Sequence, residues 1–366
     1  MEVKVLSIGQ ICKRFSSGKN ITSQNISEEG VYPVYGGNGL RGYTDTYNFE
    51  GECAIVGRQG AYCGNVKYVR GKAYMSEHAI VAVTNSEHNN KYFYYKLSLA
   101  KLGRFSGQAA QPGLSVTKLL RLKLEMPSRK YQDVIASILS TYDTLIENNT
   151  KRIRLLEKMA ENLYKEWFVR FRFPGHENVE MENGLPKGWK RGSLSDVCEF
   201  KRGKNITSSE MQEGNVPVIS AGLEPSGYHS CSNVRGVNVT MSSSGANAGY
   251  IAIHYSDIWA ADCSYIEEST TGNIYYVYEL LNNIRTVINN FQRGAAQPHV
   301  YPKDVNRIKL ILPSKELMLI ANGRLEIMHK EIYNLQKQNS LLARQRDLLL
   351  PRLMSGKLEV KEELLE

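Results

Sequence analysis

Hydrophobic and polar residues follow two different periods along this chain. In 1–128, and again in 193–313, short β-branched runs alternate with turns rich in glycine, serine and asparagine. Runs of this length between turns are typical of strands. We predict strands at 52–56, 78–83, 237–240 and 250–253 and helices at 91–102 and 274–291. The pattern predicts mixed α/β domains with many loops.

After a proline in each half, Pro127 and Pro313, glycine becomes rare and apolar residues recur at alternating steps of three and four. This spacing is the a/d pattern of a coiled coil. A helix of about 35 residues would be about 50 Å long, which overshoots a domain with a radius of about 14 Å. We therefore expect the two helices to pair as an antiparallel coiled coil, with Asn149 and Asn339 in the seams. The second helix should end at Leu350, before Pro351.

The chain contains the same segments twice, in the same order. Gly-Lys-Asn-Ile-Thr at 18–22 returns at 203–207, and Ala-Ala-Gln-Pro at 109–112 returns at 295–298. The spacing of 185 to 186 residues far exceeds the roughly 20–50 residues of a solenoid repeat. The fold class is therefore α+β, with two tandem mixed α/β domains, each followed by a long helix. We place the domains at 1–128 and 193–313, the helices at 129–170 and 314–356, a linker at 171–192 and a charged tail at 357–366.

The composition limits the possible surroundings and partners of the chain. A hydrophobic fraction of 42% and a charged fraction of 23% are ordinary for a globular protein. The net charge of +9 favours a polyanionic partner. No apolar run approaches the roughly 18–20 residues that cross a bilayer, and no secretory signal or Cys-x-x-Cys pair is visible. We expect a cytoplasmic protein without membrane contact.

No arrangement of residues in the sequence is typical of catalysis. The two Gly-Lys segments lack the Ser or Thr of a phosphate-binding loop, and the seven histidines show no zinc spacing. Gly-x-Ser-x-Gly and Asn/Asp-Pro-Pro-Tyr/Phe motifs are absent. Glu77-His78 and Asp262-Cys263 occupy similar places in the two repeats but differ in chemistry, so we interpret them as strand residues. We expect a non-enzymatic chain that holds no metal and no cofactor.

Polar, basic loops with aromatic neighbours remain as candidates for contact with nucleic acid. Cations suit phosphate, whereas Asn, Gln and Ser suit phosphate or base edges. The recurring Gly-Lys-Asn segment predicts phosphate contact or turn formation, and the differing loops, Arg58-Gln59 and Ser243-Ser244, would read different bases. A solvated surface loop is the alternative for each residue. The candidates are Arg14, Lys19, Asn20, Arg58, Gln59, Arg104 and Gln108 in the first repeat and Lys201, Arg202, Lys204, Asn205, Ser243, Asn247 and Arg293 in the second.

This organisation resembles the specificity subunit of type I restriction–modification systems, over essentially the whole chain. The motifs that carry the resemblance are Trp167-Phe168, Phe173-Pro174-Gly175, Leu-Pro-Lys-Gly-Trp at 185–189 and Leu-Leu-Pro-Arg-Leu-Met-Ser-Gly-Lys-Leu at 349–358. It implies that each domain is a target-recognition domain for one half of a bipartite double-stranded DNA site. It also implies that the helices set the gap between the halves and dock two methyltransferase subunits.

The resemblance further implies a complex that defends the cell against foreign DNA. S-adenosylmethionine would be held by the methyltransferase subunits, and ATP and Mg²⁺ by restriction subunits that act as motor and nuclease. No catalysis is expected on the present chain. Two other functions stay open: a coiled-coil scaffold that binds proteins but no DNA, and an autonomous methyltransferase or nuclease, for which we find no motif.

Overall fold

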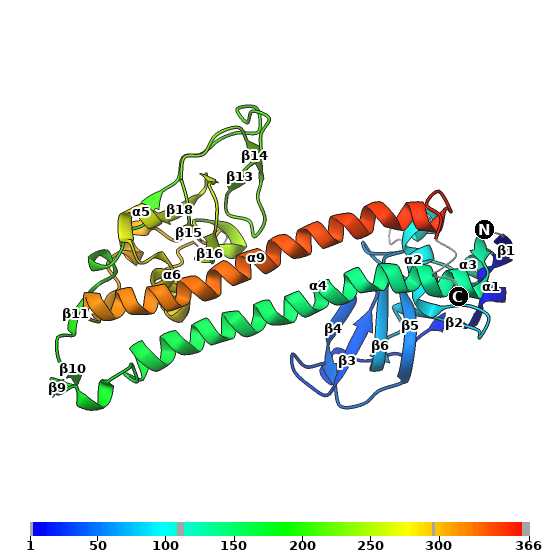
Figure 1. The fold of residues 1–366 in the computed structure, drawn as a ribbon, viewed down its shortest axis with the longest axis horizontal. Coiled ribbons are helices and arrows are strands. Elements are labelled where there is room, and N and C mark those ends of the chain that lie inside the picture. The colour runs from blue at the N-terminus through cyan, green and yellow to red at the C-terminus, as the bar shows by residue number, and fades with distance from the viewer. Residues whose placement is uncertain (1–2, 108–112, 295–296, 361–366) are drawn as a thin grey trace. The chain divides into compact units, whose positions relative to one another are not determined.

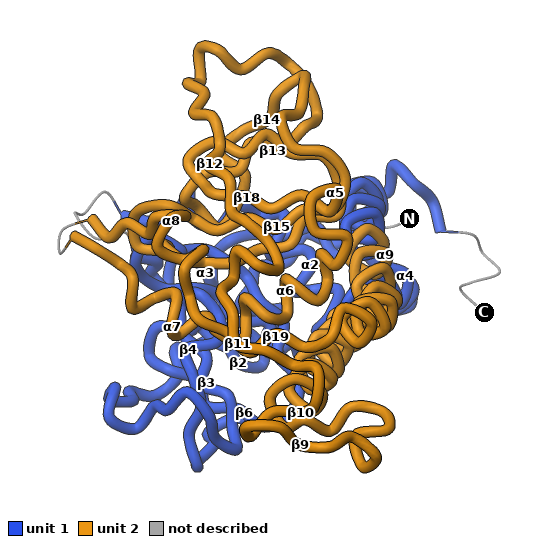
Figure 2. The backbone as a smooth tube through the Cα atoms, turned by 90° about the vertical axis from the view of Figure 1, so that its left-hand side faces the viewer, with its two compact units in different colours: residues 1–147, 339–366 blue, residues 148–338 orange. Residues whose placement is uncertain are grey.

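The computed structural model describes residues 3–107, 113–294 and 297–360, which form two compact units (Figures 1 and 2). Unit 1 comprises residues 1–147 and 339–366, and unit 2 comprises residues 148–338. Each unit contains one mixed α/β domain and a part of each of the two long helices, so the division between the units falls within the helices. Gln108, one of the predicted contact residues, lies outside the described residues.

A six-stranded sheet in the order β2-β7-β5-β6-β3-β4 forms the body of the domain in unit 1. Strand β7 is buried throughout, because alternate residues pack on opposite faces. Ile80 packs with Phe93 of α2 on one face, and Val81 packs with Ile55 on the other. The elements are β1 Val3–Ser7, α1 Ile8–Ile11, β2 Cys12–Ser17, β3 Tyr32–Gly36, β4 Gly39–Thr44, β5 Phe49–Gly57, β6 Val66–Met75, β7 Ala79–Thr84, α2 Asn90–Leu99, α3 Val116–Leu120 and β8 Lys123–Pro127.

The domain in unit 2 has the same strand pairings, but its sheet is divided into β12-β18-β15-β16 and β14-β13-β17. In unit 1 the single strand β6 pairs with both β5 and β3, whereas in unit 2 the chain leaves the sheet at 255–258, between β16 and β17. The elements are β9 Met181–Glu182, β10 Leu185–Pro186, β11 Lys190–Ser193, β12 Lys201–Arg202, β13 Val216–Ile219, β14 Gly227–His229, β15 Asn238–Ser242, β16 Ile251–His254, β17 Trp259–Ala260, β18 Cys263–Glu267, α5 Glu268–Thr271, α6 Ile274–Asn283, α7 Arg285–Asn289, α8 Pro302–Val305 and β19 Lys309–Leu312.

The first and last strands of each domain pair with each other. β1 pairs antiparallel with β8, and β11 pairs antiparallel with β19. The two ends of each domain therefore lie side by side, immediately before a long helix. Helix α4 (Arg129–Tyr164) continues into a π turn at Lys165–Val169, and helix α9 covers Lys315–Met354.

Helix α9 continues past Pro351, so the prediction that Pro351 ends it at Leu350 was wrong, and it ends at Met354, within the range 314–356. A proline inside a helix removes one backbone donor. The last turn, however, buries Leu353 and Met354 in the core of unit 1, and burial of such a side chain contributes about 1.5–3 kcal/mol. The predicted helix at 274–291 is also interrupted, at Ile284, and forms α6 and α7.

Polar contacts join α4 and α9 within each unit. In unit 2, Arg152 Nη2 lies 2.7 Å from Glu331 Oε1, and Asn149 Nδ2 donates to Gln338 Oε1 at 3.3 Å. In unit 1, Arg346 Nη1 lies 2.8 Å from Asp143 Oδ1. Across the described ranges, no helix has the length and apolar content needed to cross a membrane.

We expect His254 on β16 to make unit 2 sensitive to acid. Burial lowers the pKa of His254 from its ordinary value of 6.5 to about 4, and Nε2 of the ring lies 2.8 Å from Thr240 Oγ1. Because the unfolded chain takes up the proton first, stability that is fully present above pH 6.5 is lost as the pH falls toward 4. The His254→Gln variant should lose less free energy of unfolding across this range, as measured by urea titration at each pH. Equal losses in the variant and the unmodified protein would contradict this assignment.

Candidate nucleic-acid interface

The Gly-Lys segment of each repeat is held by two backbone hydrogen bonds to the strand ends on either side of the turn before a central strand. Strand β7 follows this turn in unit 1, and β18 follows it in unit 2. The side chains of both lysines remain exposed. The amides of Gly18 and Lys19 donate to the carbonyls of Ala79 and Met75, and those of Gly203 and Lys204 donate to Cys263 and Ala260, at 2.8–3.0 Å.

Close backbone contact explains why glycine occurs at this position in both repeats. A Cβ on Gly18 would lie 2.1 Å from the carbonyl oxygen of Met75, and a Cβ on Gly203 would lie 2.4 Å from that of Ala261. No side chain fits at such distances, so the neighbouring backbone would have to move. The segment therefore has a fixed backbone that presents an exposed lysine.

A glycine-rich loop follows the central strand β5 or β15 in each unit. Gly60 and Gly64 of unit 1 have φ angles of 83° and 89°, and Gly245 and Gly249 of unit 2 have φ angles of 73° and 82°. Side chains with a Cβ rarely adopt this left-handed conformation. The glycines shared by the repeats therefore give the two loops the same backbone, on which different side chains are carried.

In unit 1 this loop is bonded to the end of β2 and to the turn before β7. Arg58 Nη1 donates to Ser17 Oγ at 3.2 Å, and Gln59 Oε1 lies 3.1 Å from His78 Nδ1. Arg58 is partly buried, whereas Gln59 is exposed. The structure therefore brings Arg58 and Gln59 next to the segment that carries Lys19.

In unit 2 the corresponding loop binds the corresponding turn through different groups. Ser244 occupies the place of Gln59, and its Oγ donates to Asp262 Oδ2 at 2.6 Å. Ser243 and Ser244 are each only 6% exposed. This burial removes both from any surface that could touch a ligand, so neither is available to read bases as the sequence predicted. Asn247 is partly exposed, and its Nδ2 lies 3.5 Å from the carbonyl oxygen of Ala221.

Two further arginines lie beside the glycine-rich loops. Arg104 belongs to a 3₁₀ turn, Leu102–Phe105, and its guanidinium lies 4.8 Å from the centre of the Phe105 ring. Gly64 packs on Gly103 of the same turn. In unit 2, the backbone of Arg293 pairs with that of His299, and its Nη2 lies 2.9 Å from Asp304 Oδ2.

The remaining candidates lie apart from the glycine-rich loops. Arg14 lies within β2, and its guanidinium is 5.9 Å from the centre of the Phe49 ring, at the far end of β5. Lys201 and Arg202 are exposed and form β12, which pairs with β18. Asn20 and Asn205 are exposed and follow the glycine and lysine of the Gly-Lys segments directly.

His78 and Asp262 were missed as site residues. Their similar places in the two repeats could have pointed to them. The prediction that they are strand residues was wrong for both, because they lie in the turns before β7 and β18. Among the described residues, no group of three or more His, Cys, Asp or Glu side chains could hold a metal ion. The loops instead present ammonium, guanidinium and amide groups, which suit phosphates and base edges.

A family model described as the type I restriction modification DNA specificity domain matches residues 1–158 and 186–338. The two matched ranges contain the two repeats, with their glycine-rich loops and Gly-Lys segments. The chain therefore belongs to the family of type I restriction modification DNA specificity domains. The resemblance to this family that the sequence motifs indicated is confirmed.

Individual relatives agree with this family. The EcoprrI specificity subunit of Escherichia coli is 39% identical over 166 residues, which cover 44% of this chain and 41% of that protein. The chain thus spans less than half the length of that relative. The MjaIX specificity subunit of Methanocaldococcus jannaschii is 26% identical over 302 residues, covering 75% of this chain and 70% of the relative.

A solved structure has the same fold. The S subunit of a type I restriction-modification system from M. genitalium superposes with a TM-score of 0.68 at 20% identity, covering 96% of each chain. The similarity confirms the mixed α/β architecture with a long C-terminal helix.

Proposed function

We propose that this chain is the DNA-reading, non-catalytic subunit of a type I restriction–modification complex. Each domain reads one half of a bipartite site in double-stranded DNA. The observation that carries this proposal is the loop framework shared by the units, in which a glycine-rich loop bonds to the turn beside an exposed lysine. Different accessible side chains on the same framework, the exposed Gln59 in unit 1 and the partly exposed Asn247 in unit 2, would read different bases.

The long helices set the spacer and dock two methyltransferase subunits in this proposal. Antiparallel pairing is supported by the contacts of α4 with α9, because residue numbers rise along α4 while those of its partners fall along α9. Exposed apolar side chains support docking, since such patches often mark protein interfaces. Examples in unit 2 are Leu155, Met159 and Ile327, which is 72% exposed.

The partners supply the chemistry in this assembly. The methyltransferase subunits hold S-adenosylmethionine, and the restriction subunits hold ATP and Mg²⁺ and act as motor and nuclease. The present chain holds none of these groups and contributes DNA binding alone. The complex works on DNA in the cytoplasm, without contact to a membrane.

Binding to duplex DNA at several salt concentrations tests this function. We expect the full chain with its methyltransferase partners to bind more weakly as salt rises, because phosphate contacts release counterions. Lys19→Ala should weaken binding to all sequences and reduce the salt slope by about one, whereas Arg58→Ala should cost about 1–3 kcal/mol at one base pair. The readout is the affinity for a panel of single-base variants of the site.

Lys130→Ala is the matched control, because Lys130 is exposed on α4, outside the loops. It should leave both the affinity and the salt slope nearly unchanged. If Arg58→Ala weakened every site variant equally, Arg58 would position DNA and not read it. If the unmodified protein bound no duplex at any salt concentration, the scaffold function would replace the proposed one.

A further inference from the structure

In each unit a short helix of the domain packs against the long helix that follows the domain. In unit 1 this is α2 on α4, and in unit 2 it is α6 on α9. Tyr95 and Glu279 are the sixth residues of α2 and α6, and Asp143 and His329 are the fifteenth residues of α4 and α9. The two contacts, Tyr95 with Asp143 and Glu279 with His329, are therefore equivalent in the repeats.

The start of each short helix is held by a side-chain amide of the long helix in both units. Gln132 Oε1 of α4 accepts a hydrogen bond from the amide of Asn89 at 2.9 Å, immediately before α2. Asn322 Oδ1 of α9 accepts bonds from the amides of Tyr275 and Tyr276 at 3.1 and 3.2 Å. A side-chain amide of the long helix thus satisfies free donors at the N-terminus of the short helix in each repeat. The two contacts are alike in kind, but Gln132 is the fourth residue of α4 and Asn322 the eighth residue of α9, so they do not occupy equivalent positions.

One turn further along the short helix, the chemistry differs between the units. In the Asp143 cluster of unit 1, the carboxylate accepts hydrogen bonds from Tyr95 Oη at 2.5 Å, Lys91 Nζ at 2.9 Å and Arg346 Nη1 at 2.8 Å. Burial raises the pKa of Asp143, but the bonds from Tyr95, Lys91 and Arg346 outweigh it and hold the pKa below its ordinary value. Here the long helix α4 supplies the anion, and the short helix α2 supplies donors.

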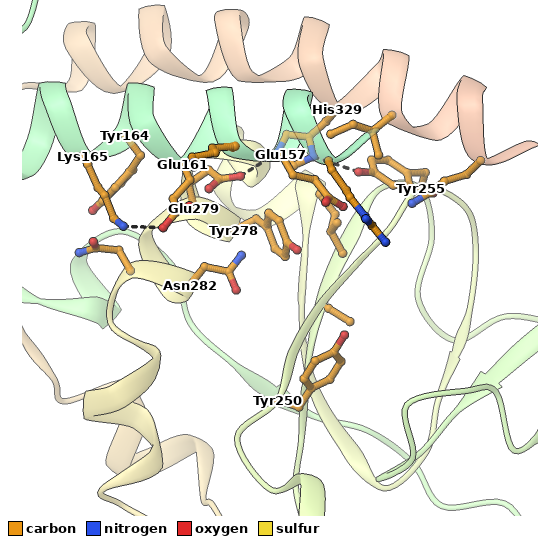
Figure 3. Close-up of a pocket in the computed structure, with 17 residues that line it drawn as sticks. Glu157, Glu161, Tyr164, Lys165, Tyr250, Tyr255, Tyr278, Glu279, Asn282 and His329 are labelled. Atoms are coloured by element: carbon orange, nitrogen blue, oxygen red, sulfur yellow. Dashed lines mark hydrogen bonds and ion pairs between the residues drawn. The ribbon is translucent and has the colours of Figure 1, made fainter. Parts of the chain in front are cut away.

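The His329 cluster of unit 2 reverses this arrangement (Figure 3). His329 is only 2% exposed, and its Nε2 lies 3.0 Å from Glu279 Oε1 of α6. Its Nδ1 lies 2.9 Å from Tyr255 Oη, and the ring of Tyr275 stacks on the imidazole at a centroid distance of 5.4 Å. Here the long helix α9 supplies the imidazole, and the short helix α6 supplies the carboxylate.

We propose that Asp143 and His329 determine which of the two domains each long helix accepts. If the domains changed places, Glu279 would face Asp143, and two carboxylates would share a half-buried position. His329 would lose its carboxylate and face Tyr95 and Lys91. Unfavourable contacts in the wrong pairing are a common source of specificity. In terms of the proposed function, on which this consequence rests, the two clusters fix the order in which the half-sites are read.

The first experiment transfers the chemistry of unit 1 into unit 2 of the full chain. His329→Asp places a carboxylate against Glu279, and we expect the midpoint of thermal unfolding to fall by about 6–12 °C. The double variant His329→Asp/Glu279→Tyr recreates the Asp143–Tyr95 pair and should recover at least half of this loss. A cavity of about 750 Å³ that is lined by Glu279 and His329 provides room for the phenol (Figure 3).

His329→Asn is the control, because it removes the imidazole without adding a charge. It should lower the midpoint by less than His329→Asp does. Equal losses in the Asp and Asn variants, with no recovery in the double variant, would overturn the proposal. This readout needs no DNA, so it stays interpretable even if the chain proves not to bind a duplex.

The second experiment exchanges residues 1–128 with residues 190–313 in the full chain, so that β11 moves together with its partner β19. We expect the exchanged chain to bind its rearranged site at least about tenfold more weakly than the parent binds its own, because both clusters are mismatched. Adding Asp143→His and His329→Asp restores both pairings and should return most of this affinity. Parental affinity without the two substitutions would show that the clusters do not select domains.

Discussion

Removing one heptad from each long helix is expected to shorten the spacer of the recognised site by about three base pairs. Seven residues of helix measure about 10 Å, and each base pair occupies about 3.4 Å. Suitable segments are 144–150 and 339–345, which lie between the Asp143–Arg346 and Arg152–Glu331 contacts. Because the loops are untouched, the bases read should not change. Affinity for the original site should fall to the non-specific level, about a thousandfold or more.

The measurement is binding of the folded complex to duplexes that differ only in spacer length. Methylome sequencing of cells that carry the shortened chain gives an independent readout. A variant in which the same fourteen residues are replaced by another heptad sequence of equal length keeps the helices long and should retain the original spacer. A folded deletion variant that still prefers the original spacer would show that the helices do not set the distance.

Replacing the glycine of a Gly-Lys segment by alanine is expected to have the second largest effect on stability and DNA affinity. In Gly203→Ala the new Cβ would lie 2.4 Å from the carbonyl oxygen of Ala261, and in Gly18→Ala it would lie 2.1 Å from that of Met75. Backbone must move in both cases, which costs about 1–3 kcal/mol or more. Lys19 and Lys204 would move with it. Each variant should therefore lower both the free energy of unfolding and the affinity for all DNA sequences.

Gly323→Ala provides a matched control in unit 2. A Cβ on Gly323 meets nothing within 4 Å, and the residue lies inside α9. Alanine is favoured over glycine in a helix by roughly 0.5–1 kcal/mol, so this change should stabilise the protein slightly. Urea unfolding of the three variants compares the effects directly. Wild-type stability of Gly203→Ala would refute the steric explanation for the backbone geometry that the two Gly-Lys segments share.

Local periodicity predicted the central part of each domain. Strands β5, β7, β15 and β16 lie where β-branched runs stand between turns, and α2 and α6 lie where helical composition was recognised. The local pattern is enough to predict these strands because their apolar residues, which are buried on the sheet faces, are adjacent in the sequence. The two Gly-Lys segments were recognised as a pair, since a repeated segment is visible without knowledge of its contacts.

Partners that are distant in the sequence could not be predicted in this way. β1 pairs with β8 from opposite ends of the domain sequence, and no feature of either strand's sequence identifies the other as its partner. Strand β6 was missed because Arg70, Gly71 and Lys72 interrupt any apolar run, although backbone hydrogen bonds to β5 hold it in the sheet. The burial of Ser243 and the contacts of His78 and Asp262 depend on tertiary packing, which a loop sequence does not report.

The division of the sheet in unit 2 has a consequence for the cooperativity of each domain. In unit 1, opening of β3 and β4 disturbs β6, which also carries the ladder to β5. In unit 2, β13, β14 and β17 can separate while β15 keeps its bonds to β16 and β18. Sub-global opening follows such breaks in hydrogen-bonded continuity. We therefore expect the lobe of β13, β14 and β17 in unit 2 to open at a lower free energy than any part of the continuous sheet of unit 1.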